Sequence, residues 1–325
     1  MRHQHSNTTY RHLYENQPTT CKADINALRI DKRNMGLASS AESNRRSSCS
    51  VKTQELLVTN EEDGFEIVSK LWTGGDAMAT KARAAAVFLH GGIFSRNDRN
   101  SHAPVSEALV RDCGLSVLTA DFRDGSSTTF RSGKTLSDLK ALVRFMKSKY
   151  PKLPFGVIGS SSGGYFALQL RNALQSGDIH FCIPLAPVAD PKARALYLRD
   201  CIDGSTPISD SYLVRHTAER AQFMLDHQLK YFESFQQMSI ATEQVVKNKH
   251  GIPTLLVLGG ADKNIPFQVT QNVQQEWATR TIILGGIGHE LQNEPSASPA
   301  HNYVSDINRF LEVLLDEKNE ANQRH

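Results

Sequence analysis

Three consecutive serines stand between glycines in the stretch VIGSSSGGYFALQL, a setting in which a serine can act as a nucleophile. An apolar run ends at Gly159 and a helical pattern begins near Gly163, so the serines lie in a strand-to-helix turn. A serine at the centre of such a turn projects its hydroxyl, and the residues two positions away on each side must be small. Only Ser161 has glycine at both of these positions, whereas Ser160 and Ser162 do not. The G-x-S-x-G spacing predicts Ser161 as the nucleophile.

A serine hydroxyl needs a base to remove its proton and an acid to orient that base. His289 follows the apolar run TIILGG in a glycine-rich loop, and Asp262 follows the apolar run TLLVLGG. Asp190, after the earlier run HFCIPLAP, is the alternative acid, and an aspartate in either loop can also form a turn or cap a helix. We expect Ser161, Asp262 and His289, each just after a strand, to form a catalytic triad.

A second pair of glycines, Gly91 and Gly92, follows the apolar run AAAVFLH. Two adjacent glycines after a strand are most often an ordinary turn. They also allow a backbone N–H group to approach a ligand closely, because no Cβ obstructs the approach. The pair by itself does not separate these two interpretations.

Short apolar runs alternate with longer helical patterns from about residue 51 onward. The first two runs, at 54–59 and 65–72, predict an antiparallel pair of strands. The later runs are too apolar to alternate between a core and solvent, which is typical of strands that are covered on both faces. They lie at 84–90, 115–122, 155–160, 180–187, 254–260 and 281–286. Helical patterns lie at 104–114, 135–151, 163–174, 269–280 and 303–318. This alternation predicts an α/β fold with a mainly parallel sheet of about eight strands and helices on both faces.

The domain organisation follows from the same patterns. Residues 1–50 are rich in Ser, Asn, Thr, Arg and His without periodicity, so we expect a disordered N-terminal tail, although the Arg and Ser content also suits a transit segment. The folded domain is expected at 51–318, with a C-terminal tail at 319–325. Residues 190–250 separate two strands by far more chain than a crossover needs, which predicts a helical cap insertion. The aromatic residues of this insertion are candidates to line a pocket or to pack the cap: Tyr197, Tyr212, Phe223, Tyr231, Phe232 and Phe235.

The charge and cysteine content of the chain argues against several classes of protein. The 37 basic and 34 acidic residues leave a net charge of +3, which gives no support to a nucleic-acid or membrane-surface role. No cluster of like charges in the sequence demands a charged substrate. The chain lacks a membrane-spanning apolar run and a secretory signal, so we expect a cytoplasmic protein, or an organellar one if the N-terminal tail is a transit segment. The five cysteines form no metal-binding pattern, so no metal is expected.

Five stretches together carry a resemblance to a known family: FLHGGIF, DFR, GSSSGGY, GGADKNIP and GIGHE. The chain from about 51 to 318 resembles the α/β-hydrolases, and more narrowly the group of esterases, kynurenine formamidases and prolyl-oligopeptidase-like enzymes. In that group, the His-Gly-Gly stretch after the third strand helps to form the oxyanion hole. The resemblance implies that the hole uses the backbone N–H of Ser162 together with that of Gly92 or Ile93, with Gly91 in the same loop.

We expect a serine hydrolase that cleaves a carboxylic ester of modest size through an acyl-enzyme intermediate, without a metal or an organic cofactor. The alternative within the same chemistry is an amide or peptide hydrolase of the formamidase or prolyl-peptidase kind. An alternative of another class is a binding protein that keeps the fold without catalysis. The expected partner is a small-molecule ester or amide, and the sequence gives no oligomeric state.

Overall fold

The computed structural model describes residues 50–75, 82–92, 98–123, 132–174, 177–226, 250–267, 269–270, 278–291 and 301–323. The tail expected at 1–50 lies, apart from Ser50, outside the described residues. So does most of the helix expected at 269–280. All contacts discussed below lie within one compact unit, Ser48–His325.

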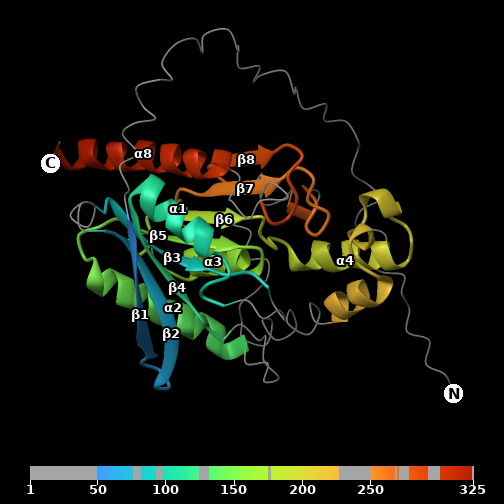
Figure 1. The fold of residues 1–325 in the computed structure, drawn as a ribbon, viewed down its shortest axis with the longest axis horizontal. Coiled ribbons are helices and arrows are strands. Elements are labelled where there is room, and N and C mark those ends of the chain that lie inside the picture. The colour runs from blue at the N-terminus through green and yellow to red at the C-terminus, as the bar shows by residue number, and fades with distance from the viewer. Residues whose placement is uncertain are drawn as a thin grey trace, which may run out of the picture. The chain divides into compact units, whose positions relative to one another are not determined.

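Eight strands form a single sheet in the order β1-β2-β4-β3-β5-β6-β7-β8 (Figure 1). The pairs β1·β2 and β2·β4 are antiparallel, and every later pair is parallel. The strands are β1 (Val51–Asn60), β2 (Phe65–Gly74), β3 (Ala84–Leu89), β4 (Leu115–Ala120), β5 (Phe155–Ser160), β6 (Phe181–Leu185), β7 (Leu255–Gly259) and β8 (Arg280–Leu284). This mixed, mostly parallel sheet confirms the predicted fold class, including the antiparallel opening pair.

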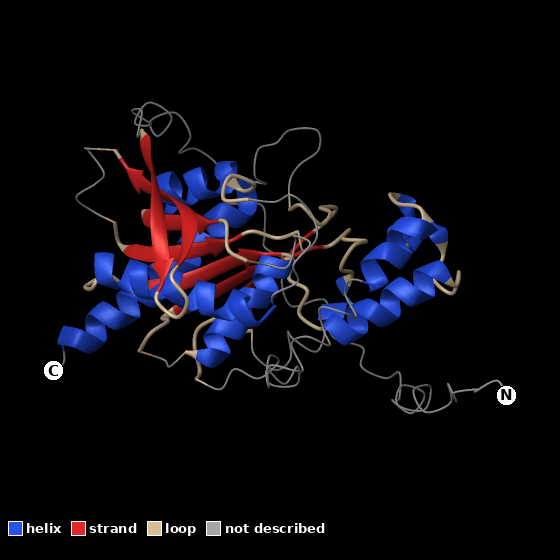
Figure 2. Ribbon diagram, turned by 90° about the horizontal axis from the view of Figure 1, so that it is seen from below, coloured by secondary structure: helices blue, strands red, loops and turns tan. Residues whose placement is uncertain are grey.

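The central strand β3 explains why the parallel runs are so apolar. All six of its residues are buried, and they alternate between two separate cores. Val87 and its neighbours at alternate positions face the core under α2 (Ser132–Lys149) and α3 (Ser162–Ala173). Phe88, together with Ala84 and Ala86, faces the core under α1 (Ala103–Cys113) and α8 (His301–Gln323). Helices therefore cover both faces of the sheet, as Figure 2 also shows, and each buried large side chain contributes about 1.5–3 kcal/mol.

The described part of the expected insertion, 190–226, is helical and has a small apolar core of its own. It contains α4 (Pro191–Ile202), two 3-10 turns, η6 (Ile208–Asp210) and η7 (Tyr212–Val214), and a helical stretch at 218–226. Its core residues are Ala195, Leu198, Cys201, Tyr212, Ala221 and Leu225. The rest of the insertion, 227–249, lies outside the described residues.

The last helix, α8, reaches Gln323 and so includes most of the stretch 319–325 that we expected as a tail. The helix continues past the last apolar position because the polar residues that follow include no helix breaker. None of the helices among the described residues combines the length and the apolar character that a membrane crossing needs.

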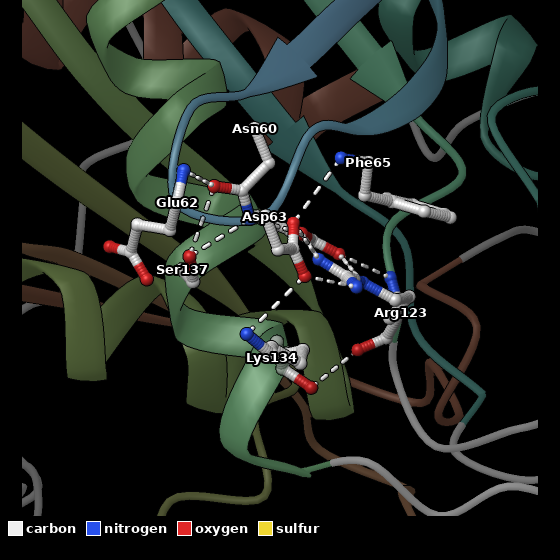
Figure 3. A network of polar contacts seen from close by, with 9 residues as sticks. Asn60, Glu62, Asp63, Phe65, Arg123, Lys134 and Ser137 are labelled. Carbon is white, nitrogen blue, oxygen red and sulfur yellow. Dashed lines mark hydrogen bonds and ion pairs between the residues drawn. The ribbon is translucent and has the colours of Figure 1, made fainter.

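A partly buried polar network fastens the β1–β2 turn to α2 (Figure 3). Arg123, just after β4, donates from Nε to Asp138 Oδ2 at 2.8 Å and from Nη1 to Asp63 Oδ2 at 2.8 Å. Asn60 Nδ2 donates to Asp138 Oδ1 at 2.7 Å, and the Asp138 side chain is fully buried. Because β1 and β4 are both antiparallel to β2, these contacts gather at the edge of the sheet where β4 ends.

The same segment after β4 also supports the loop that follows β3. Phe122, next to Arg123 in the chain, stacks on His90 with 4.5 Å between ring centroids. Both rings are buried. The polar network thereby fixes a residue that packs against the first position of the His-Gly-Gly stretch.

Candidate active site

Ser161 occupies a strained turn between β5 and α3. Its backbone has φ 54° and ψ −117°, values that a residue with a side chain rarely adopts. The Ser161 N–H donates to Leu185 O at 2.8 Å, and the Val188 N–H donates to Ser161 O at 3.1 Å. These bonds to the end of β6 and the loop after it hold the turn in place. Ser161 stands at the N-terminus of α3, where the helix dipole favours negative charge.

The two flanking glycines are required by backbone packing around this turn. A Cβ at Gly159 would lie 2.1 Å from Gly163 O. A Cβ at Gly163 would lie 2.2 Å from Leu89 O and 2.4 Å from His90 O. Backbone atoms at such distances cannot be displaced without moving a strand. The small residues of the G-x-S-x-G motif therefore allow α3 to start directly against the end of β3.

Asp262 lies in the loop after β7, where its carboxylate is buried and both of its oxygens have hydrogen-bond partners. Its Oδ1 accepts hydrogen bonds from the backbone N–H groups of Asn264 and Ile265, both at 2.8 Å. The Asp262 side chain is 2% exposed. These two bonds fix the carboxylate plane and leave Oδ2 directed toward the loop after β8.

His289 joins the other two predicted residues. The loop before it folds over Gly259, where a Cβ would lie 2.4 Å from Gly288 O, so that the imidazole reaches the end of β7. His289 Nδ1 lies 2.8 Å from Asp262 Oδ2, and its Nε2 lies 3.0 Å from Ser161 Oγ. The structure thus places His289 within hydrogen-bonding distance of both other side chains that we expected in a triad.

The alternative acid, Asp190, has a different contact. It is the N-cap residue of α4, and its Oδ1 accepts a hydrogen bond from the Ala193 N–H at 2.9 Å. This is the ordinary capping role of an aspartate at a helix N-terminus. The carboxylate that contacts His289 is that of Asp262.

The glycine pair after β3 lies against the serine turn. A Cβ at Gly91 would lie 2.8 Å from Ser160 O and 2.9 Å from Ser161 Cβ. Gly92 has φ +88°, a conformation that favours glycine. Ser162, whose backbone N–H we expect in the oxyanion hole, is the buried first residue of α3. Ile93, the other candidate of that loop, lies outside the described residues.

A pocket of about 310 Å³ opens over these residues, between the sheet edge and the insertion. The sheet side contributes Ser161, His289 and the two glycines after β3. The insertion contributes residues from α4 and from the stretch 212–224, which begins with η7. Of the aromatic candidates, Tyr212 lines the pocket. Tyr197 instead donates from its hydroxyl to Lys263 O at 2.6 Å, next to Asp262. Tyr231, Phe232 and Phe235 lie outside the described residues, and Phe223 is exposed.

Four basic side chains in the pocket wall were missed by the sequence analysis: His102, Arg194, His216 and Arg220. The pKa of His102 is lowered to about 4, mainly by burial and to a smaller extent by the nearby His90 and His289. A signal for Arg194 was present in the sequence, because it shares the i, i+4, i+7 spacing of the buried Leu198 and Cys201. An arginine on the apolar stripe of a helix is unusual and marks a buried charge.

Neither thiol chemistry nor a metal cluster is evident among the described residues. Cys113, Cys182 and Cys201 are free and buried. Burial raises the pKa values of Cys113 and Cys182 to about 12, which makes them poor nucleophiles. Within the described ranges, no three His, Cys, Asp or Glu side chains are grouped so that they could hold a metal ion.

The fold is shared with several esterases of known structure. The esterase Pf2001 of Pyrococcus furiosus superposes with a TM-score of 0.52 at 20% identity, covering 81% of this chain and 91% of that one. An esterase of Rhizomucor miehei superposes with a TM-score of 0.61 at 14% identity, covering 83% and 86%. At such low identity these likenesses establish the α/β-hydrolase fold alone.

Sequence comparison gives the family. The esterase LipU of Mycobacterium tuberculosis is 33% identical over 98 residues, a match that spans 30% of this chain and 32% of LipU. The family model described as serine aminopeptidase, S33 (Hydrolase_4) matches residues 80–296, which contain the serine turn, the acid loop and His289. The match covers well over half of the chain and confirms the resemblance to the α/β-hydrolases. The chain belongs to the serine aminopeptidase S33 (Hydrolase_4) family of the α/β-hydrolase superfamily.

Proposed function

We propose that this protein is a serine hydrolase that cleaves a carboxylic ester through an acyl-enzyme intermediate. One observation carries the proposal: His289 lies between Asp262 Oδ2 at 2.8 Å and Ser161 Oγ at 3.0 Å, at the wall of a pocket. An ionised carboxylate only accepts hydrogen bonds, so the Nδ1 of His289 carries the proton toward Asp262. The Nε2 is then free to accept the proton of the Ser161 hydroxyl.

The acylation half of the reaction begins when Ser161 Oγ attacks the ester carbonyl. His289 takes the hydroxyl proton, and Asp262 stabilises the imidazolium that forms. The carbonyl oxygen becomes an oxyanion, which the backbone N–H of Ser162 and that of Gly92 or Ile93 stabilise. Each such donor is worth about 3 kcal/mol of transition-state stabilisation. The C–O bond of the ester then breaks, and His289 returns the proton to the departing alcohol.

Deacylation repeats the chemistry with water in place of the serine. His289 removes a proton from a water molecule that attacks the acyl carbonyl, and the Ser161 Oγ leaves with the proton that His289 returns. The products are a carboxylic acid and the free enzyme. The pocket of about 310 Å³ suits a small substrate, since it lies at the lower end of the range for ligand sites.

A second candidate function, amide or peptide hydrolysis, is favoured by the description of the family as serine aminopeptidases. The same three side chains would serve, with an amine in place of the alcohol as the leaving group. An aminopeptidase also has to recognise the ammonium group of its substrate, for which Glu290 at the pocket wall is the available carboxylate. The two candidates are separated by comparing short p-nitrophenyl esters with p-nitroanilides of single amino acids.

The test of the proposal is labelling by a fluorophosphonate together with hydrolysis of p-nitrophenyl acetate and butyrate. Ser161→Ala is expected to abolish both the labelling and the hydrolysis. Ser160→Ala and Ser162→Ala are matched controls in the same turn, because neither removes the hydroxyl that contacts His289 and both keep the backbone N–H groups. If the wild-type protein and both controls remain unlabelled, the chain is a binding protein with a hydrolase fold and the proposal is wrong.

A further inference from the structure

The guanidinium of Arg194 is buried in the wall of the pocket, where the charge of Asp262 favours its charged form without forming an ion pair. The residue is 2% exposed, and no carboxylate among the described residues forms an ion pair with it. Its Nη2 donates to Asn264 Oδ1, and its carbon Cζ lies 5.5 Å from the Tyr212 ring centroid. Its Nε and Nη1 are buried with no hydrogen-bond partner among the described residues. Most of the N–H donors of this cation are therefore unsatisfied.

A buried arginine elsewhere in the chain provides a contrast. Arg171 is also fully buried, but its Nη1 donates to Thr254 Oγ1 at 3.2 Å, and its Nε and Nη2 donate to Asn172 Oδ1. Arg171 does not line the pocket. The arginine with a structural role has its donors paired, whereas the arginine at the pocket does not. An unpaired buried charge destabilises a fold, so its presence at a pocket indicates a missing ligand group.

The surroundings of Arg194 make the insertion side of the pocket electropositive. Arg220 also lines the pocket, and Arg194, Arg215 and Arg220 all lower the pKa of His216, although burial is the larger cause. The pKa of Arg194 itself is lowered to about 10 by burial, so it stays charged at neutral pH. Among the described residues of the pocket wall, the acidic side chain is that of Glu290, which follows His289 in the chain. Arg194, His216 and Arg220 come from the insertion and line the same pocket as the serine turn.

We infer that the substrate of this site carries a carboxylate, in its acyl or its alcohol part, and that Arg194 binds this carboxylate while the ester carbonyl lies at Ser161. The inference rests on the proposed ester hydrolysis and names its substrate class. A planar guanidinium matches a carboxylate in geometry, and the bond is charge-assisted. A carboxylate could also accept hydrogen bonds from the buried Nε and Nη1 of Arg194, which lack a partner among the described residues. Hydrolysis of such an ester would release an alcohol and an acid, one of which keeps the recognised carboxylate.

The test compares each charged ester with a neutral ester of the same shape. Monoethyl esters of the dicarboxylic acids from succinate to suberate are paired with the ethyl esters whose far end is a carboxamide. For the alcohol side, 4-carboxyphenyl acetate is paired with 4-carbamoylphenyl acetate. Ethyl esters are used in the acyl series because a neighbouring carboxylate accelerates the spontaneous breakdown of more activated esters. The measured quantity is the ratio of kcat/KM for the charged ester to that for its neutral partner.

Hydrogen bonds to a charged group predict a ratio of about tenfold to hundredfold in at least one series, expressed mainly in KM. Arg194→Met should reduce the ratio to about one, and Arg194→Lys should restore part of it. Arg199→Met, which removes an exposed positive charge from the same helix, is the control and should keep the wild-type ratio. Because both esters are measured on one preparation, the ratio does not depend on how much of a variant is folded.

The outcomes separate this inference from the proposed function. If p-nitrophenyl acetate is cleaved in a Ser161-dependent way but neither series favours the charged ester, the inference is wrong and the proposed function stands. If Arg194→Met lowers both members of each pair equally, Arg194 only braces Asn264 and the inference is again wrong. If no ester is cleaved and no fluorophosphonate labels the protein, the proposed function itself fails and the inference falls with it.

Discussion

Replacing Asp262 with asparagine tests which tautomer His289 adopts. Asp262 Oδ1 accepts two backbone N–H groups at 2.8 Å, so the asparagine side-chain oxygen will occupy that position and its amide nitrogen will take the place of Oδ2. That nitrogen then faces His289 Nδ1, which lies 2.8 Å from Oδ2 in the structure. An amide N–H donates to Nδ1, so the imidazole proton moves to Nε2. The Nε2 can then no longer accept the proton of Ser161.

The size of the effect follows from this loss of the base. The corresponding aspartate-to-asparagine change in a serine protease triad lowers kcat by about 10⁴-fold, which is about 5.5 kcal/mol of transition-state stabilisation at 1.36 kcal/mol for each factor of ten. We expect a loss of about 10³-fold to 10⁴-fold here. The stability should fall by only about 1 kcal/mol, because both backbone hydrogen bonds are kept. The assay is kcat for p-nitrophenyl butyrate, combined with urea unfolding.

Asp190→Asn is the matched control, since it makes the same chemical change at the other acid considered in the sequence. Asparagine caps a helix about as well as aspartate does, so α4 should be retained and kcat should stay within about threefold of the wild-type value. A loss of activity at Asp190 combined with an active Asp262→Asn protein would refute the assignment of the acid. It would also refute the tautomer argument, because both depend on the Oδ2 contact.

Three further predictions concern the stability of the fold. Gly163→Ala, whose Cβ would lie 2.2 Å from a backbone oxygen, should lower the free energy of unfolding by about 3 kcal/mol. Gly285→Ala is the control, because a Cβ there meets open space, and it should change the free energy of unfolding by less than about 0.5 kcal/mol. Equal effects of the two substitutions would contradict the packing argument. Arg123→Met removes the counter-charge of the buried Asp138 carboxylate and should cost about 3–5 kcal/mol, and adding Asp138→Asn should recover part of this loss in urea unfolding. The pKa of His102 is lowered from 6.5 to about 4, so the unfolded chain binds the proton more readily and stability falls as the pH drops from 6.5 toward 4. Relative to His102→Gln, the wild-type protein should lose about 2 kcal/mol of stability between pH 7.5 and pH 4.5. Parallel pH profiles of stability for the two proteins would contradict this prediction.

The order of the chain predicted the sheet, and it predicted that Ser161, Asp262 and His289 would meet at one edge of it. Buried parallel strands leave a local signal in their apolar runs, and the parallel strands end at one edge of the sheet, so residues just after β5, β7 and β8 must approach one another. The choice of Ser161 among three serines needed only a steric rule about its neighbours. Such features depend on short stretches of sequence and on one topology, and both can be read without coordinates.

The role of the glycine pair after β3 could not be decided from the residues alone. The sequence allowed either an ordinary turn or a close approach to a ligand, and only the resemblance favoured the second. The structure adds a physical reason for Gly91, because a Cβ there would lie 2.9 Å from Ser161 Cβ. That distance joins residues 70 positions apart in the printed sequence, and no local pattern encodes it.

The grouping of basic side chains at the pocket could not be predicted from the sequence, although the helical spacing of Arg194 gave a signal for that one residue. Arg194, Arg215 and Arg220 are separated by other residues of both signs, so the sequence contains no cluster of like charge. They act on the same imidazole only because α4 and the chain around η7 fold together around their own apolar core. The sequence contains nothing that demands a charged substrate, whereas the folded insertion places Arg194, with two nitrogens that lack a partner among the described residues, in the wall of the pocket that Ser161 also lines.

The acid loop connects the two sides of the site, and this connection has a consequence for any variant of the insertion. Arg194 donates to Asn264 Oδ1, while the backbone N–H of Asn264 donates to Asp262 Oδ1 at 2.8 Å. Tyr197 holds the same loop through Lys263 O at 2.6 Å. A change at Arg194 therefore alters substrate recognition and, through Asn264, the positioning of Asp262. The second effect acts on all esters alike, so only the ratio between a charged and a neutral ester isolates the first.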